Sequence, residues 1–277
     1  MTAKTAQIRL TRQSPTYWRV TFDNPPLNLM GPQFVLEFRE IMNTLEFDDQ
    51  VRVVVFDSAV DGFFLNHSDF KTDIKELTGI PQGPTGLEGW PDILVRLTRA
   101  PFATIALIRG RATGNGSEIA LACDMSFCSR EKTVLSQWEV GVGMVAGGGP
   151  MARLPRQIGR QRALEVLLSS DDIGGELAEA YGYVNRALPD AELDGFVDTL
   201  AKRIASFDKW AIANTKRLVN ANSLPPDVEM AEGWDACIKS VGRSGAQERI
   251  KALMAQGFHG PGDVETRLGF YLGRQSH

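Results

Sequence analysis

The sequence predicts an α/β fold, and three observations carry this prediction. Residues 18–22 alternate apolar and polar side chains in the manner of a strand, and residues 31–45 repeat apolar side chains at helical spacing. Residues 51–56, VRVVVF, form a short β-branched run that is typical of a strand buried on both faces. A chain of 277 residues is long enough to bury a large core around such a layered arrangement of strands and helices.

The first third of the chain adds a hairpin and two connections to these elements. Residues 7–10 are predicted to pair with the strand at 18–22, because a Ser-Pro turn signal lies between them. Residues 61–70 are expected to leave the VRVVVF strand as a loop. Residues 73–91 are rich in proline and glycine, which predicts a long mobile connection of a kind that is usually functional or disordered.

The rest of the chain is predicted to hold a second buried strand followed mainly by helices. Residues 102–108, FATIALI, form this strand, so two buried strands would deliver loops to one edge of the sheet, where active sites of α/β folds commonly gather. Periodicity further predicts a strand at 183–187 and helices at 93–98, 117–123, 150–157, 162–168, 191–207, 210–219 and 265–272.

The composition argues against several classes of partner and cofactor. Lysine and arginine total 30 against 34 aspartate and glutamate residues, so the net charge of −4 favours neither nucleic acid nor an anionic membrane. No apolar run approaches the roughly 18 residues of a membrane span, and no leader pattern is found, so we expect a soluble cytoplasmic protein. Cys123, Cys128 and Cys237 lack metal-ligand spacing and are interpreted as buried thiols, with no metal site.

Residues 112–149 hold the strongest functional signal. A turn at 114–116 leads into an apolar helix, whose first backbone N–H groups have no partner within the helix and suit an anion or oxyanion. Glu118 lies in the first turn of this helix, Glu139 follows a strand-like run, and a triple glycine stands at 147–149. Two carboxylates beside free N–H groups predict acid/base chemistry on a carbonyl compound. The alternative is that Glu118 only complements the helix dipole and Glu139 is a surface or ion-paired residue.

Several segments together resemble the crotonase, or enoyl-CoA hydratase/isomerase, superfamily. They include VTFDNPPLN, VRVVVFDSAVDGFF, SDFK, IRGRATGNGSEIALACDMSF, EVGVG, GGGPMARLPRQIGRQRALEVLLS and AYGYVNRALPD. The resemblance extends from the first hairpin through Pro189. It implies a ββα spiral catalytic core over residues 1–200 and a helical region over residues 201–277 that closes the CoA pocket and forms a homotrimer or a dimer of trimers.

The same resemblance implies an acyl-CoA substrate and a set of site residues. The thioester oxygen would rest between the backbone N–H groups of Ser68 and Asn115, which would stabilise an enolate by about 3 to 4 kcal/mol per donor. Glu118 would deprotonate water for attack at C3, and Glu139 would deliver a proton to C2. Coenzyme A would enter only as part of the substrate, with no separate cofactor. Further substrate or CoA contacts would come from His67, Asp69, Phe70, Lys71, Gly114, Gly116, Phe270 and Arg274.

Three positions depart from the family pattern and leave the reaction open. Asn115 and His67 stand where small residues are usual, and Trp138 precedes Glu139 where proline is common, with one extra residue between Asp124 and Glu139. Hydration of a 2-enoyl-CoA is the favoured reading. The alternatives are double-bond isomerisation, another CoA-thioester reaction such as hydrolysis, decarboxylation or C–C cleavage, and a non-catalytic acyl-CoA-binding protein.

Overall fold

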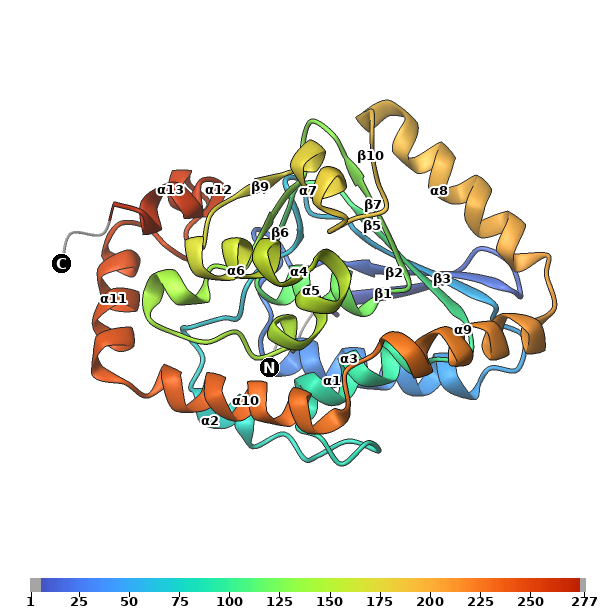
Figure 1. Cartoon of the computed structure of the whole chain (residues 1–277), viewed down its shortest axis with the longest axis horizontal. Helices are drawn as coiled ribbons and strands as arrows, with labels where there is room; N and C mark the ends of the chain where they lie inside the picture. The colour runs from blue at the N-terminus through green and yellow to red at the C-terminus, as the bar shows by residue number, and fades with distance from the viewer. Residues whose placement is uncertain (1–5, 275–277) are drawn as a thin grey trace.

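Two β-sheets form the centre of the molecule, and helices surround them (Figure 1). The computed structural model describes residues 6–274. The larger sheet has the order β1-β2-β3-β5-β7-β10 and the smaller one β4-β6-β8-β9. The larger sheet consists of β1 (Ile8–Arg12), β2 (Tyr17–Phe22), β3 (Val53–Ser58), β5 (Ala103–Ile108), β7 (Met125–Ser129) and β10 (Arg186–Leu188). The smaller sheet consists of β4 (Phe63–Leu65), β6 (Arg111–Thr113), β8 (Val134–Ser136) and β9 (Ile173–Gly174).

Successive strand pairs are divided between the two sheets in a repeated ββα pattern. In the pairs β3–β4, β5–β6 and β7–β8, the first strand joins the larger sheet and the second joins the smaller sheet, and a helix follows each pair. Strands β2, β3, β5, β7 and β10 run parallel, and only β1 is antiparallel to its neighbour in this sheet. The predicted α/β spiral is therefore confirmed. The helices of this part are α1 (Pro32–Phe47), α2 (Ile74–Thr78), α3 (Gly89–Arg99), α4 (Asn115–Ala122), the short 3-10 helix η1 (Glu139–Val142), α5 (Pro150–Ile158), α6 (Arg160–Ser169) and α7 (Gly175–Tyr181).

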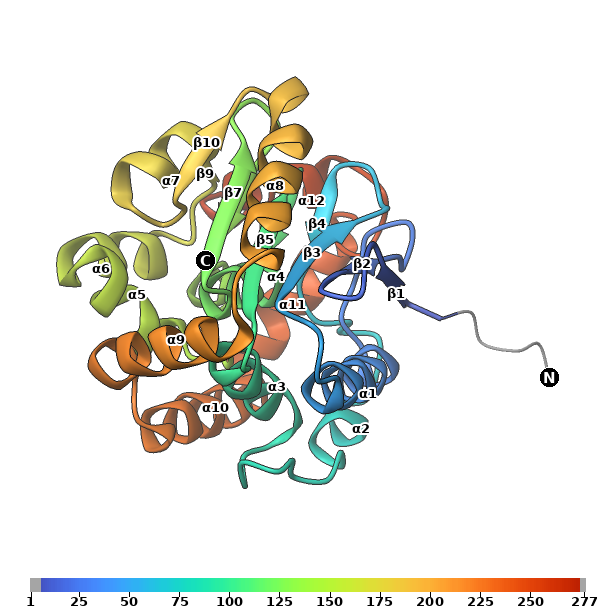
Figure 2. The same ribbon diagram turned by 90° about the vertical axis from the view of Figure 1, so that its right-hand side faces the viewer.

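Strand β3 explains why the VRVVVF run has no polar face. Val54 and Phe56 pack into the main core with the apolar stripe of α1, whereas Val53 and Val55 pack on the opposite face. That opposite face is covered by α8 (Asp190–Ala205), which crosses β5 and β7 in Figure 2. Burial on both faces favours apolar side chains at the first four positions of the strand, Val53–Phe56, as the sequence predicts.

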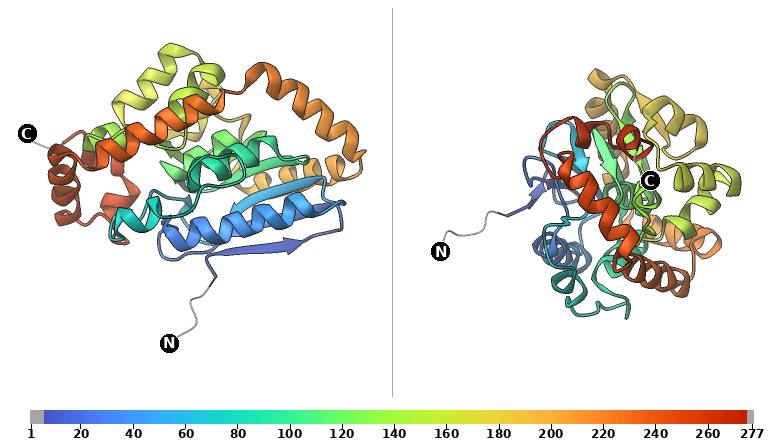
Figure 3. Two further views of the ribbon diagram at one scale, coloured as in Figure 1. Left: turned by 90° about the horizontal axis from the view of Figure 1, so that it is seen from below. Right: turned by 90° about the vertical axis from the view of Figure 1, so that its left-hand side faces the viewer.

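The C-terminal helices wrap back over the core and reach the strand edge that carries the site. They are α9 (Lys209–Ser223), α10 (Asp227–Val241), α11 (Ser244–Ala255), α12 (Asp263–Thr266) and α13 (Leu268–Leu272). Helix α10 packs against α3, and α11 packs against η1. Figure 3 shows the C-terminal helices in orange and red. The sequence analysis missed α10 and α11, whose faces are only partly apolar. Among the described residues, no helix is long and apolar enough to cross a membrane.

Residues 73–91 differ from the predicted unstructured connection. This segment contains α2 and the first turn of α3, which begins at Gly89 rather than at residue 93. The turn between the two helices is tied to α3, because the Asp92 carboxylate accepts hydrogen bonds from the Thr85 backbone N–H at 3.1 Å and hydroxyl at 2.8 Å. Local capping thus orders a stretch whose composition indicates a loop.

Candidate active site

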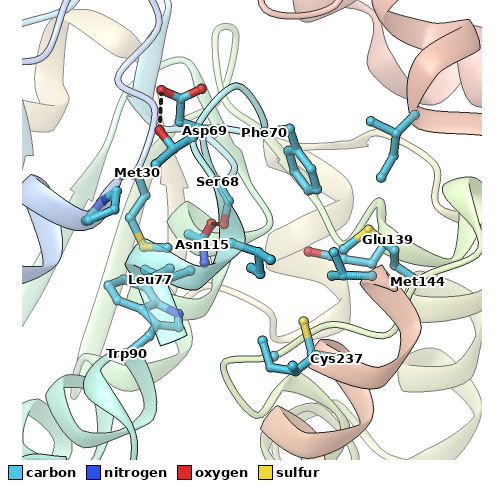
Figure 4. Close-up of a pocket in the computed structure, with 18 of the residues that line it drawn as sticks. Met30, Ser68, Asp69, Phe70, Leu77, Trp90, Asn115, Glu139, Met144 and Cys237 are labelled. Atoms are coloured by element: carbon cyan, nitrogen blue, oxygen red, sulfur yellow. Dashed lines mark hydrogen bonds between the residues drawn. The ribbon is translucent and has the colours of Figure 1, made fainter. Parts of the chain in front are cut away.

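A cavity of about 240 Å³ lies between the loop after β4, the start of α4, η1 and the C-terminal helices. Figure 4 shows Ser68 and Asn115 on one side of this cavity and Glu139 with Met144 across from them. The wall residues come from segments far apart in the sequence: Met30, Ser68, Asp69, Phe70, Leu77, Trp90, Asn115, Glu118, Trp138, Glu139, Met144, Trp234, Cys237, Ile238, Val241 and Ile250.

Two backbone N–H groups at the cavity have no acceptor within the described part of the protein. The first belongs to Ser68, and the second belongs to Asn115, which opens α4. The Asn115 N–H is unpaired because the first N–H groups of a helix have no carbonyl one turn earlier. The side chains of the two residues also meet, since the Ser68 hydroxyl donates to Asn115 Oδ1 at 2.9 Å. This arrangement can receive an oxyanion between two N–H donors.

The Glu118 carboxylate is buried, with 1% of the residue exposed, and it accepts three hydrogen bonds. Oε2 accepts from the Trp90 indole at 2.7 Å and from the Asn115 amide at 3.1 Å, and Oε1 accepts from the Gly148 N–H at 2.6 Å. Burial raises the pKa of Glu118, while these three donors oppose the rise by stabilising the carboxylate. A carboxylate offers about four acceptor positions, so about one remains open, on Oε1.

Gly148 approaches Glu118 so closely that any larger residue would require the Glu118 carboxyl group to move. A Cβ atom at position 148 would overlap the Glu118 carboxyl group. The glycine-rich segment at 147–149 therefore serves as a close-approach donor to Glu118.

Glu139 is in the opposite situation. It lies at the start of η1, with 8% of the residue exposed, and its Oε2 has no hydrogen-bond partner among the described residues. Burial, together with the neighbouring Glu118 charge, raises the pKa of Glu139 to about 8. A carboxyl group in this setting is protonated at neutral pH and can donate a proton. Gly114 makes room for it, because a Cβ there would lie 2.8 Å from Glu139 Oε1.

The remaining wall of the cavity is mainly apolar. Met30 and Leu77 line it on the N-terminal side, and Trp234, Ile238 and Val241 line it from α10. An apolar group attached to the reacting carbonyl therefore finds an apolar surface, while the carboxylates lie on the other side. Cys237 also faces the cavity, and burial raises the pKa of its thiol. The three cysteines are free thiols, and among the described residues no cluster of His, Cys, Asp and Glu could hold a metal ion.

The other residues proposed from the sequence are divided between the cavity and its surroundings. Asp69 and Phe70 line the cavity, whereas Lys71 is exposed beside it, with its ammonium 3.4 Å from the His259 carbonyl oxygen. Gly114 and Gly116 shape the backbone without lining the cavity, since Gly116 packs against the Leu65 carbonyl.

Phe270 and Arg274 lie on the outer surface at the C-terminal end. Both are exposed, and the Arg274 guanidinium stacks over the Phe270 ring at 4.1 Å from its centroid. Neither residue reaches the cavity of its own chain.

His67 does not line the cavity, and the expectation that it forms part of the substrate channel is therefore corrected. Its residue exposure is 0%, and its Nε2 lies 3.0 Å from Oε2 of Glu265. The ring is drawn inward because a buried carboxylate and an aromatic neighbour, Phe258, hold it behind the loop. The extra residue before Glu139 also leaves that carboxylate on the cavity wall.

Sequence reasoning missed Trp90 and the residues of α10. The single tryptophan in a glycine- and proline-rich stretch is the signal that could have identified Trp90, because such a side chain needs a burial site. The position of α10 over the cavity depends on contacts with α3 and α5, which no local pattern encodes.

Comparison with known proteins places these features in context. Residues 13–252 match the sequence profile of the enoyl-CoA hydratase/isomerase family. A Mycobacterium bovis protein named as an enoyl-CoA hydratase is 30% identical over 210 residues, 73% of each chain. The short-chain-enoyl-CoA hydratase of Clostridium acetobutylicum is 27% identical over 78% of this chain and 82% of its own. A solved Streptomyces avermitilis structure described as an enoyl-CoA hydratase aligns over 100% of both chains, with 40% identity and a TM-score of 0.94.

Proposed function

The chain belongs to the enoyl-CoA hydratase/isomerase family, and we propose that it adds water across the C2–C3 double bond of a 2-enoyl-CoA. One observation carries the proposal: two buried carboxylates with different hydrogen-bond surroundings face one cavity beside two unpaired N–H groups. Hydration needs all three of these parts, which are a base for water, an acid for C2 and donors for the thioester oxygen.

The proposed reaction assigns a separate task to each group. The thioester oxygen accepts hydrogen bonds from the N–H groups of Ser68 and Asn115, which makes C3 electrophilic. Water occupies the open acceptor position on Glu118 Oε1 and gives this carboxylate a proton as its oxygen bonds to C3. The electron pair of the double bond moves into an enolate.

The second half of the reaction delivers a proton. The protonated Glu139 gives its proton to C2, and the enolate collapses to the saturated 3-hydroxyacyl thioester. Glu118 then carries the proton that water lost, and Glu139 is ionised. One proton transfer between the two carboxyl groups, through solvent in the cavity, restores the starting state.

The direct test is the loss of the enoyl-thioester absorbance when purified protein meets short, medium and aromatic 2-enoyl-CoAs. The proposal expects turnover of at least one substrate to the 3-hydroxyacyl-CoA, identified by mass, without release of free CoA thiol. Release of the thiol would indicate hydrolysis or another thioester reaction. Binding of acyl-CoA without turnover across the panel would instead favour a non-catalytic binding protein.

Double-bond isomerisation is a second candidate, and one observation favours it. Three donors already hold Glu118, whereas Glu139 Oε2 has no partner among the described residues, so the ionised form of Glu139 could take a proton from C4 and deliver it to C2 by itself. Incubation with a 3-enoyl-CoA distinguishes the reactions. Formation of the 2-enoyl-CoA without further hydration would support the isomerase.

The wider substrate and assembly proposals follow the same family resemblance. We expect Lys71, and Arg274 with Phe270, to contact the CoA portion, because both cations are exposed near the ends of cavity-bearing segments. We also propose a homotrimer or a dimer of trimers. Helix α9 presents apolar side chains to solvent, among them Trp210 at 74% exposure, which suits a subunit interface. Light scattering measures the mass of the assembly.

A further inference from the structure

A buried polar cluster outside the carboxylate pair joins the loop at 66–69 to the C-terminal segment at 258–265. The Glu265 residue, 1% exposed, is the centre of this cluster. Its carboxylate accepts from His67 Nε2 at 3.0 Å, from Asn66 Nδ2 at 2.9 Å and from the His259 N–H at 2.6 Å. The two segments are 198 residues apart in the chain, so tertiary structure alone creates this contact.

The orientation of the His67 ring shows what its two nitrogens do. Nε2 faces the Glu265 carboxylate, and Nδ1 lies 2.9 Å from the Ser68 carbonyl oxygen. Both partners are oxygen acceptors, so each contact is a hydrogen bond when the ring nitrogen that faces it carries a proton. The ring also stacks on Phe258, with centroids 4.3 Å apart at 27°, and cannot turn without breaking this contact.

Hydrogen bonds hold the backbone on both sides of the Ser68 N–H. The Met30 N–H donates to the His67 carbonyl at 3.0 Å, and the Asp69 N–H donates to the Met30 carbonyl at 2.8 Å. The Ser68 carbonyl is held by His67 Nδ1. The Ser68 N–H itself has no acceptor among the described residues. It lies in the His67–Ser68 peptide plane, and the Ser68–Asp69 plane that His67 Nδ1 holds limits how far the Ser68 backbone can turn.

We propose that His67 is a positioning residue for the oxyanion site, because its Nδ1–H fixes the Ser68 carbonyl and thereby aims the Ser68 N–H at the thioester oxygen. Glu265 fixes the ring in turn, so the C-terminal segment supports the oxyanion loop of its own chain. The inference rests on the proposed role of the Ser68 N–H as a thioester donor. His67 itself does not touch the substrate.

Two variants of His67 separate positioning from stability. His67→Asn keeps a donor near the place of Nδ1 and loses the contact with Glu265, whereas His67→Gln keeps a donor near Nε2 and loses the contact with Ser68. Both remove the ring from its stack on Phe258, so they are matched for lost packing. Glu265→Gln is a third variant of unchanged shape, in which an amide replaces the carboxylate that faces His67 Nε2.

The expected result is a split between the variants in kcat. We expect His67→Gln to lower kcat by ~10-fold or more with little change in KM, because misplacing a catalytic donor by about 1 Å can cost up to a hundredfold. His67→Asn should stay within a few-fold of the wild type, and Glu265→Gln should fall between them. Thermal unfolding identifies any variant that does not fold, and kcat is then compared between the remaining two variants and the wild type.

A binding readout makes the test independent of turnover. The probe is 4-(dimethylamino)cinnamoyl-CoA, whose absorbance moves to longer wavelength when its carbonyl oxygen accepts hydrogen bonds. The wild type and His67→Asn should show this shift, and His67→Gln should show a smaller one. A wild type that shifts the probe but does not hydrate any 2-enoyl-CoA would refute the proposed function and leave the positioning role standing. Equal shifts in His67→Gln and His67→Asn, or no shift in the wild type, would overturn the positioning role.

Discussion

Glu118 and Glu139 face the same cavity and are both buried, yet their surroundings differ in kind. Glu118 lies in the first turn of α4 and accepts hydrogen bonds from an indole, an amide and a backbone N–H. Glu139 begins a short 3-10 helix and has an oxygen without a partner among the described residues. We propose that these two identical side chains serve opposite tasks, Glu118 as a carboxylate and Glu139 as a protonated acid.

The comparison shows that hydrogen-bond donors, rather than burial, separate the two groups. Burial raises the pKa of both, but only Glu118 has donors that compensate for the lost hydration. The charge on Glu118 then raises the pKa of Glu139 further, so each group reinforces the state of the other. Environments that separate two carboxyl groups in this way are typical of acid/base pairs.

The largest expected effect comes from removing each carboxyl group in turn. We expect Glu118→Gln to lower the hydration kcat by ~10² to 10⁴-fold, the usual contribution of a general base, while any isomerisation of a 3-enoyl-CoA persists. Glu139→Gln should abolish both reactions, because hydration needs the proton on Glu139 and isomerisation needs its carboxylate to carry a proton from C4 to C2. Rates with the two substrates, measured side by side on both variants, test this. Equal loss of isomerisation in the two variants would contradict the separation of roles.

The pH dependence should show which group limits activity in alkali. Because the acid form of Glu139 is required and its pKa lies at about 8, the hydration kcat should fall about tenfold per pH unit above that value. Stopped-time assays from neutral to alkaline pH provide the profile, with thermal unfolding at each pH as the control. A kcat that stays constant through pH 9 would show that Glu139 does not act as the acid.

The two substitutions should also differ in their effect on the free energy of unfolding, with Glu118→Gln the more destabilising of the two at low pH. In Glu118→Gln an amide N–H₂ would meet the donors of Trp90 or Gly148, which should cost about 1 to 3 kcal/mol for a lost buried hydrogen bond. Glu139→Gln loses no hydrogen bond of Oε2 and should be near neutral at low pH.

The pH dependence of that difference follows from linkage. The folded pKa of Glu139, about 8, lies above its ordinary value of 4.5, so the stability that its protonated form provides is complete below 4.5 and is lost as pH rises through 8. Glu139→Gln should therefore become progressively more stable than the wild type over this range. Denaturant unfolding at several pH values measures both variants, and a constant difference would contradict the raised pKa.

The smallest effect should come from Trp90→Phe, which removes one hydrogen-bond donor from Glu118 and leaves both carboxyl groups in place. This variant keeps an aromatic ring in the cavity wall but deletes the indole N–H that donates to Glu118. The pKa of Glu118 should rise, because a hydrogen bond to its charged form is lost, and the acidic limb of the activity profile should move to higher pH. Leu77→Ala, on the same wall without a contact to Glu118, is the control. An unchanged acidic limb in Trp90→Phe would show that the indole does not tune Glu118.

Part of this arrangement could be predicted from the sequence, and the division has a physical basis. The buried strands and the turn before Glu118 depend on local periodicity and on glycine positions, so they could be predicted from the residues themselves. The ββα order was predicted from the resemblance to the crotonase superfamily. Trp90 and α10 reach the cavity only through tertiary packing, and their sequences carry no motif of their own.

His67 is the clearest failure of local reasoning. The family resemblance suggested a channel or loop residue, but its position is set by Glu265, far along the chain. Ion pairs between distant segments leave no periodic or spacing signal, so the buried side of the oxyanion loop could be found only in the structure.

The central claim is that Glu139 carries a proton at neutral pH while Glu118 does not. Infrared difference spectroscopy of the protein, titrated from acid to alkali, detects the C=O stretch of a buried protonated carboxyl group. We expect one such band at pH 7, which disappears as the pH passes about 8 and is absent from Glu139→Gln. In Glu118→Gln the band should be present but should disappear at a lower pH, because loss of the Glu118 charge reduces the pKa of Glu139. A band that persists in Glu139→Gln and vanishes in Glu118→Gln would contradict the central claim.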